Sequence, residues 1–198
     1  MGKATFTPSL DAYAFYVDGT ESGASIIGSQ DNAISPTITS DYNIAIRLRL
    51  QENGGASGAT TDGWQLRCKR NAGAYFSVGT ATTYVKAYDS ANLTNAGATT
   101  QRLTNGSGSF DAGVISEDGL ADNYQLSKNN FTELLFTIRL VYADLVDADT
   151  LTFQIQLNGS DITFNVTPTI NVTKGTAYSL TPSDTMSLAD SLTSLQGS

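Results

Sequence analysis

The stretch Tyr42-Asn43-Ile44-Ala45-Ile46-Arg47-Leu48-Arg49-Leu50 has apolar residues at its even positions and mostly polar residues at its odd positions. Successive side chains of a β-strand point to opposite faces, so this alternation predicts a strand with one face on an apolar core. The alternation puts Arg47 and Arg49 on the second face, and we expect both to lie in water or at a sheet edge.

Strand-forming runs recur along the rest of the chain. Two hairpins are predicted, because an Asn-Ala-Gly turn follows residues 64–69 and an Asn-Gly turn follows residues 151–157. Residues 131–141 are apolar on both faces, which predicts a strand that is central in its sheet or is covered on its second face by a neighbouring subunit. Weaker strands are expected at residues 12–17, 83–87, 110–115 and 169–172.

The composition favours strands and turns over helices. Hydrophobic residues make up 40% of the 198 residues, enough for a sizeable core, and charged residues make up only 15%, against roughly 25% in ordinary soluble domains. Thr, Ser, Asn and Gly fill the difference; Thr suits a pleated sheet, and Gly and Asn suit turns. The formal net charge of -8 repels phosphate backbones, so nucleic-acid binding is not expected.

The chain contains one cysteine, Cys68, and no histidine. A single cysteine cannot form an intrachain disulfide, which leans toward synthesis in a reducing compartment, and Cys68 is expected to be a small buried apolar residue. The N-terminal residues contain no apolar run that could serve as a signal peptide. No segment approaches the roughly 20 apolar residues needed to cross a membrane, so no membrane association is expected.

Both ends of the chain are expected to be arms around a β-sandwich domain at residues 12–175. Residues 88–130 are a long connection inside that domain, of a length that usually has a function or packs against something. Residues 1–11 and 176–198 are the expected contact elements that order on docking; leucines at helical spacing allow one short helix in the second arm. A disordered tail is the alternative there. The residues expected to contact a partner are Met186, Leu188, Leu192 and Leu195.

The absence of histidine removes His-based catalysis and His-ligated zinc, so we expect neither an enzyme nor a bound cofactor or metal. Two acidic sets remain, and both are expected to be solvated turns rather than catalytic carboxylate pairs. Calcium binding is the alternative for the first set, because hard cations take clustered oxygens. The sets are Glu117, Asp118 and Asp122, and Asp144, Asp147 and Asp149.

A sugar-binding face is a further alternative, since aromatic rings present a flat apolar surface with a polar edge. Core packing is the simpler interpretation, above all for Trp64, which alternates in phase with Leu66 and Cys68. The aromatic residues concerned are Trp64, Tyr75, Tyr84, Tyr88 and Tyr124.

A set of segments is informative as a group: Ala98-Thr99-Thr100-Gln101-Arg102-Leu103, Gly108-Ser109-Phe110-Asp111-Ala112-Gly113, Glu117-Asp118-Gly119-Leu120-Ala121, Trp64-Gln65-Leu66-Arg67, Phe131-Thr132-Glu133, Pro168-Thr169-Ile170 and Ser187-Leu188-Ala189-Asp190-Ser191-Leu192. Together they resemble structural proteins of tailed bacteriophages. The resemblance covers most of residues 12–195, and its motifs are structural rather than catalytic. Relatives with longer tails carry more repeats of the last kind, which favours a compact component over a long fibre here.

The resemblance implies a virion surface component: a capsid decoration (cement) protein, a head fibre or a tail-associated protein. We expect an all-β fold, an antiparallel β-sandwich of jelly-roll-like type with extended N- and C-terminal arms. We expect a homo-oligomer, a homotrimer, that is synthesised in the host cytoplasm, binds the major capsid protein and stabilises the assembled head at the capsid surface of the virion. The alternative is a host-recognition module on a tail or fibre that binds carbohydrate.

Overall fold

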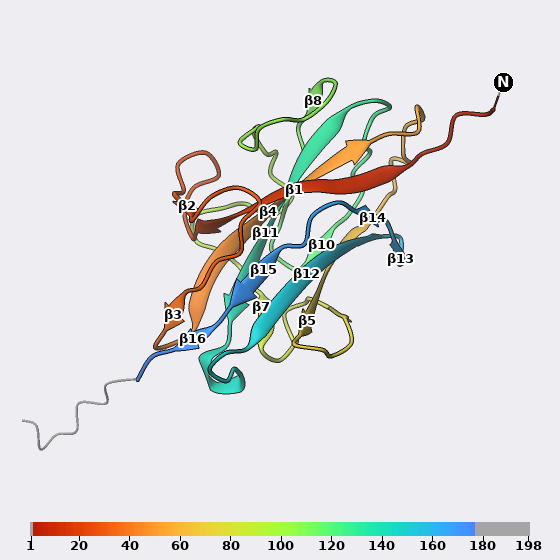
Figure 1. Cartoon of the computed structure of the whole chain (residues 1–198). Helices are drawn as coiled ribbons and strands as arrows, with labels where there is room; N and C mark the ends of the chain where they lie inside the picture. Colours follow the sequence, from red (N-terminus) through yellow and green to blue (C-terminus); the bar gives the residue numbers. More distant parts are fainter. Residues whose placement is uncertain (1, 177–198) are drawn as a thin grey trace, which may run out of the picture.

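β-Strands dominate the part of the chain that the computed structural model describes, residues 2–176 (Figure 1). The alternating runs of the sequence form its longest strands, because that pattern suits a sheet with one face on a core. Within these residues the only helical element is one short 3-10 turn. In chain order the elements are β1 (Pro8–Val17), β2 (Ile26–Ile27), β3 (Thr37–Ile38), β4 (Tyr42–Glu52), β5 (Trp64–Arg70), β6 (Phe76–Ser77), β7 (Val85–Ala87), β8 (Phe110–Asp111), β9 (Ile115–Ser116), β10 (Leu120–Ala121), β11 (Phe131–Leu140), η1 (Tyr142–Asp144), β12 (Thr150–Leu157), β13 (Ser160–Asp161), β14 (Thr163–Phe164), β15 (Thr169–Asn171) and β16 (Thr173–Lys174).

Two sheets face each other across one apolar core. The first has the order β14-β1-β4-β11-β7, and the second has the order β10-β5-β12-β13, with β6 on β5 and β15 on β12. Phe15, Ile46 and Phe136 lie side by side in the first sheet. Cys68 lies beside Phe153 in the second. The rings of Phe15 and Phe153 meet between the sheets at a centroid distance of 6.2 Å, so the expected all-β sandwich is confirmed.

The chain crosses between the sheets twice in the same way, from β4 to β5 and from β11 to β12. β4 pairs antiparallel with β11, and β5 pairs antiparallel with β12. This is the strand order of an immunoglobulin-type Greek-key sandwich, whereas a jelly roll would pair the first crossing strand with the last. The predicted all-β sandwich is present, and the strand order within it is a finer feature that the alternation did not specify. Alternation shows which face of a strand is buried but not which strand is its neighbour, because every strand here carries the same pattern.

Residues 163–175 close one side of the sandwich. β14 pairs in parallel with β1, whereas β15 pairs with β12 in the second sheet, so this segment joins the two layers. β3 runs parallel beside β16 at the end of the same segment (Figure 1). The second predicted hairpin is thus shorter than its sequence suggests, because β13 pairs with β12 over two residues and the chain then changes sheets.

The outer face of the first sheet is buried under the chain's own long connection. We call residues 88–118 the cover. A second apolar cluster joins Leu103 and Ile115 of the cover to Leu135 of β11; its other buried members are Ala12, Ala14, Tyr16, Ala24 and Ala45. The second face of β11 is therefore covered by the same chain, and β11 is central between β4 and β7.

The cover also corrects the prediction for Arg47 and Arg49. Neither lies in water or at an edge: Arg47 is 0% exposed and Arg49 is 6% exposed. Their cross-strand neighbours on β1 are Ala14 and Ala12, whose small side chains leave room for the guanidinium groups. The prediction is wrong because the pattern of one strand does not reveal a second layer that a distant part of the chain supplies.

The domain begins earlier than residue 12, because residues 8–11 of the predicted N-terminal arm belong to β1. Leu10 pairs with Leu50 of β4, and a β-bulge at Asp11 follows before pairing resumes at Ala12. A bulge inserts one residue and breaks the alternation. The period-two pattern of the sequence therefore starts only at Ala12.

The residues before β1 pack on their own chain. The Thr5 N–H donates to the Gly54 carbonyl at 3.2 Å, and the Phe6 ring meets Trp64 edge-on at a centroid distance of 6.3 Å. Of the predicted C-terminal arm, only Thr176 falls within the described residues.

Candidate functional site

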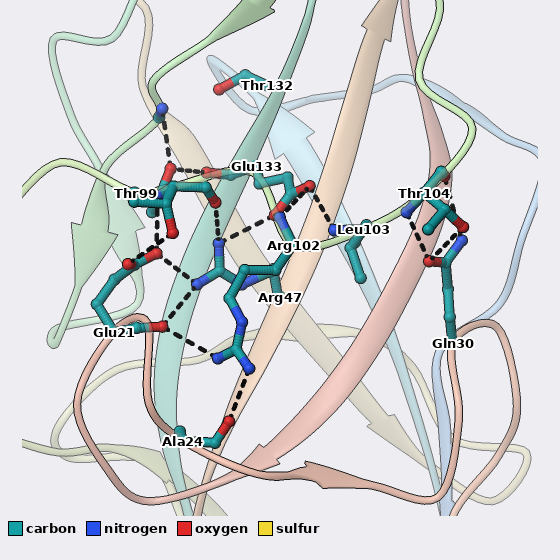
Figure 2. Close-up of polar contacts among 12 residues, drawn as sticks. Glu21, Ala24, Gln30, Arg47, Thr99, Arg102, Leu103, Thr104, Thr132 and Glu133 are labelled. Carbon is teal, nitrogen blue, oxygen red and sulfur yellow. Dashed lines mark hydrogen bonds and ion pairs between the residues drawn. The ribbon is translucent and has the colours of Figure 1, made fainter.

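Arg47 lies at the centre of an ionic cluster between the first sheet and the cover, and Figure 2 shows its partners. Its guanidinium donates to Glu21 Oε1 at 2.6 Å and to Glu133 Oε2 at 3.0 Å. It also donates to the Thr100 carbonyl at 2.7 Å. The Arg47 and Glu133 side chains are both 0% exposed, so their attraction and added hydrogen bonds must offset a large desolvation cost.

Two carboxylates extend this cluster into the cover. Glu133 accepts the backbone N–H of Leu103 at 2.7 Å and that of Arg102 at 2.9 Å. Glu21 accepts the Thr100 N–H at 2.8 Å. Burial alone would raise the pKa of Glu21, but the hydrogen bonds from Arg47 and Thr100 outweigh it and lower that pKa. The cluster fastens the cover to the sheet, and its charged groups are already paired with one another.

A second carboxylate clasp lies at the end of β4. Glu52 is 2% exposed. Its oxygens accept four backbone N–H groups, from Gly54 at 2.6 Å, Asn129 at 2.8 Å, Gly55 at 3.0 Å and Thr7 at 3.2 Å. Burial raises the pKa of Glu52, but these hydrogen bonds outweigh it, so the pKa lies below its usual value. Glu52 joins the N-terminal segment to two loops.

The first predicted acidic set does not converge. Glu117 is buried and accepts the Ser90 N–H at 2.7 Å. Asp118 is exposed and bonds within its own turn, accepting from Ser116 Oγ at 3.1 Å. Asp122 is exposed as well. Among residues 2–176 no group of three His, Cys, Asp or Glu side chains is arranged to hold a metal ion, so this geometry gives the calcium alternative no support.

The second acidic set fastens the turn after β11. Asp149 is buried and accepts from Val146 N–H at 2.7 Å and from Arg70 Nε at 2.8 Å. Asp147 accepts the Lys174 N–H at 2.8 Å. Burial raises the pKa of Asp149, but the hydrogen bonds from Val146, Arg70 and Asn71 outweigh it and lower that pKa. These carboxylates organise a turn; the third, Asp144, is exposed.

The predicted aromatic residues do not form one face. Trp64 is 0% exposed and donates Nε1–H to the Tyr124 carbonyl at 3.1 Å. Tyr124 and Tyr88 are buried too. Tyr75 and Tyr84 are half-buried, and their rings lie against cations, Lys69 Nζ standing 5.0 Å from the Tyr75 centroid. Core packing therefore accounts for Trp64, as its alternation predicts.

Cys68 is fully buried in the core. Burial raises the pKa of its thiol, because the thiolate would lose its hydration. The thiol is thus kept protonated, which removes its value as a nucleophile and agrees with the predicted structural role.

The outer face of the second sheet is polar, in contrast to the buried outer face of the first. Gln65, Arg67 and Lys69 of β5 point outward beside Gln156, Gln154 and Thr152 of β12. Apart from Gln154 and Thr152, these side chains are half-buried. On this face the paired strands β5 and β12 therefore carry a row of polar side chains.

Asp161 of β13 gathers three side chains of this face. Asp161 Oδ1 accepts from Gln156 Nε2 at 2.7 Å and from Gln154 Nε2 at 3.2 Å, and lies 3.9 Å from Arg67 Nη1. The Asp161 side chain is nevertheless 59% exposed. We call Arg67, Gln154, Gln156 and Asp161 the Asp161 site. Its carboxylate is held in one place by its donors and stays open to solvent.

A hollow of about 410 Å³ adjoins Asp161 at the end of the β12–β13 hairpin. Leu157 and Ile162 give it an apolar part, while Ser160 and Thr163 give it hydroxyls. Residues 6–8 form its other wall. These three residues belong to the predicted N-terminal contact element, whereas the predicted contacts Met186, Leu188, Leu192 and Leu195 lie outside the described residues.

The sequence interpretation missed both polar arrangements. Glu133 is a charged residue within an apolar run, and that signal could have pointed to a buried partner such as Arg47. Gln154 and Gln156 alternate with Phe153 and Ile155, which could have indicated an outward row of amides. The position of Asp161 beside both of them depends on the turn that brings β13 back along β12.

Comparisons of the chain with protein-family models, with curated proteins and with solved structures found no match. Among residues 2–176 there is no helix with the length and apolar character that crossing a membrane requires.

Proposed function

We propose that this protein is a non-enzymatic structural component of a tailed-bacteriophage virion, a decoration (cement) protein on the surface of the assembled head. The observation that carries the proposal is that its buried and half-buried carboxylates fasten parts of the fold to one another. Glu21, Glu52, Glu133 and Asp149 each bind backbone N–H groups or a guanidinium that fasten the cover, a loop or a turn. Such contacts stabilise a fold, and their donors leave little capacity for proton transfer to a substrate.

The sheet edges support the same function. β7, β10, β13 and β14 at the ends of the two sheet paths are two or three residues long. Short edge strands offer few unpaired backbone groups to another sheet, which prevents edge-to-edge aggregation. A protein made in the host cytoplasm and held in solution until a shell is available needs this protection.

The mechanism is mass action. A homotrimer that binds the major capsid protein only in the assembled shell lowers the free energy of that shell and so resists its disruption. Residues 1–7, which precede β1, and residues 176–198 are the proposed contact elements, with Met186, Leu188, Leu192 and Leu195 as the apolar contacts.

Reconstitution on heads that lack the protein tests this proposal. We expect the full chain to load at the head surface, to raise the temperature at which heads lose their genome, and to lose at least about tenfold in affinity when residues 179–198 are deleted, equivalent to about 1.4 kcal/mol. The matched control changes Ser187 and Ser191 to Ala in the same segment and should load normally. Localisation to the tail by electron microscopy, or full loading of the deletion variant, would contradict the proposal or its contact assignment respectively.

A further inference from the structure

The outer face of the second sheet has the chemistry of a ligand surface rather than of a dry protein interface. Protein interfaces have an apolar, aromatic-rich centre, whereas the outward positions around Asp161 carry amides, hydroxyls, a guanidinium and a carboxylate. Such groups lose water favourably only when a ligand replaces each hydrogen bond. A ligand with many hydroxyl groups does this, because each hydroxyl both donates and accepts.

The Asp161 site is prearranged for such a ligand. Gln154 and Gln156 both give Nε2–H to Asp161, which fixes the plane of each amide. Gln154 is buried, so it is the half-buried Gln156 that keeps its Oε1 as an acceptor for a ligand. The three residues stand on paired strands, β12 and β13, and strands hold side chains more accurately than loops. Little conformational entropy is then lost when a ligand binds.

The hollow beside Asp161 adds an apolar surface next to these polar groups. Its volume of about 410 Å³ lies within the range of roughly 300–1,000 Å³ that is usual for small-ligand pockets. Leu157, Ile162 and Pro8 offer contact to C–H groups, and Ser160 and Thr163 offer hydroxyl partners. A sugar ring has the same division, with C–H groups on its faces and hydroxyls at its rim.

The charge distribution indicates which sugars fit. The chain carries a formal net charge of -8, which repels polyanions at long range. Among the described residues that line the hollow, the only ionic side chain is that of Asp161, which would also repel an acidic sugar. Arg67 lies 3.9 Å from this carboxylate and partly neutralises it. A neutral glycan meets neither repulsion.

We propose that the Asp161 site and its hollow bind a neutral polysaccharide, with one sugar ring in the hollow and its hydroxyls on Asp161 and Gln156. This binding function goes beyond head decoration and does not depend on it. It also differs in place from the aromatic face that the sequence suggests, because Trp64, Tyr88 and Tyr124 are buried.

Titration of the full chain with dextran, mannan and galactan, and with alginate and hyaluronate as acidic probes, tests the proposal by calorimetry. We expect saturable binding to at least one neutral polymer and about tenfold or greater weakening in both Asp161→Ala and Gln156→Ala, the loss expected for a charged or paired hydrogen bond. Asn171→Ala removes an exposed amide from the same face, and Asp122→Ala removes an exposed carboxylate elsewhere; both should bind within about twofold of the original chain.

Thermal melting of each variant shows whether its fold is intact, and Gln156→Ala alone suffices if Asp161→Ala is unstable. No binding to any neutral polymer, preference for the acidic probes, or equal weakening by Asn171→Ala would each overturn the proposal. Loading of the Asp161→Ala variant on heads separates the two functions. If this variant loads on heads normally but no longer binds glycan, the result supports both the decoration function and a separate glycan site.

Discussion

Arg47 and Glu133 lie diagonally across β4 and β11, two residues out of register, because Arg47 faces Leu135 and Glu133 faces Arg49; both side chains are 0% exposed. Each guanidinium or carboxylate there is stabilised only by its partners, since the low dielectric of the interior makes an unpaired charge costly. The attraction within the pair therefore adds less to the stability of the fold than the removal of one partner would subtract. Its value to the fold is that Glu133 also holds the backbone of Leu103 in the cover.

Glu133→Gln should destabilise the protein by about 3–5 kcal/mol, because it leaves Arg47 buried with one carboxylate fewer. The double variant Arg47→Met/Glu133→Leu should cost clearly less than the sum of Arg47→Met and Glu133→Leu, because it removes both charges together. Urea unfolding measures all four. Arg67→Met is the surface control, since the Arg67–Asp161 pair spans 3.9 Å at partial exposure and should contribute at most about 1 kcal/mol. If the destabilisation of the double variant equals the sum of the destabilisations of Arg47→Met and Glu133→Leu, this account is contradicted.

At the scale of elements, the cover is a layer that packs on the outer face of the first sheet and pairs with β11. β9 pairs with β11, and the Thr99 N–H donates to the Gly113 carbonyl at 3.0 Å. Gly113 sits where a Cβ would overlap the Glu133 carbonyl oxygen, so the cover approaches β11 closely only because this residue has no side chain.

Gly113→Ala should loosen the cover without unfolding the sandwich. The added methyl forces the backbone away from β11, at a cost of about 1–3 kcal/mol. Hydrogen exchange of amides in residues 96–116 should then speed up relative to amides of β4 and β11, because the cover opens as a local unit. Ala112→Ser, at the adjacent exposed position, is the control. Uniform acceleration across all strands would show instead that cover and sandwich unfold together.

The strands themselves were largely predictable, because their signal is local. Four long strands begin and end within about two residues of the alternating runs: β4, β5, β11 and β12. This agreement is expected because the alternation itself specifies where a strand lies. The bulge at Asp11 and the change of sheets after β13 were not predictable, since each depends on a partner strand distant in sequence. The same holds for the Arg47 cluster and the Asp161 site. The sequence contains their residues, but it does not predict that these residues lie close together in the fold.

At the scale of the whole molecule, pH stability follows from carboxylates bound in the folded state. The pKa values of Glu21, Glu52 and Asp149 are lowered on folding, because their hydrogen bonds outweigh the effect of burial. A carboxyl with a lowered pKa contributes stability that is complete above its unfolded value, about 4.3 for Glu and 3.9 for Asp. That contribution is lost as the pH falls through the folded pKa.

The free energy of unfolding should therefore be nearly flat between about pH 5 and pH 8, where a chain without histidine has little to titrate, and should fall steeply below about pH 4. Thermal melting across this range measures it. Glu52→Gln should be less stable at pH 7 by about 2–3 kcal/mol, the cost of losing charged hydrogen bonds. It should also show a shallower decline in acid. An acid slope unchanged in Glu52→Gln would rule out Glu52 as a source of that decline.

The sequence by itself determined the all-β class, the long strands, the face that each turns to the core and the burial of Trp64 and Cys68. These follow from period-two alternation and composition, which act within a few residues. Only the tertiary structure decided the Greek-key strand order, the second layer that buries Arg47 and Arg49, and the meeting of Asp161 with Gln154 and Gln156. Those features depend on contacts between segments far apart in the chain, and no local pattern specifies which distant segment supplies the partner.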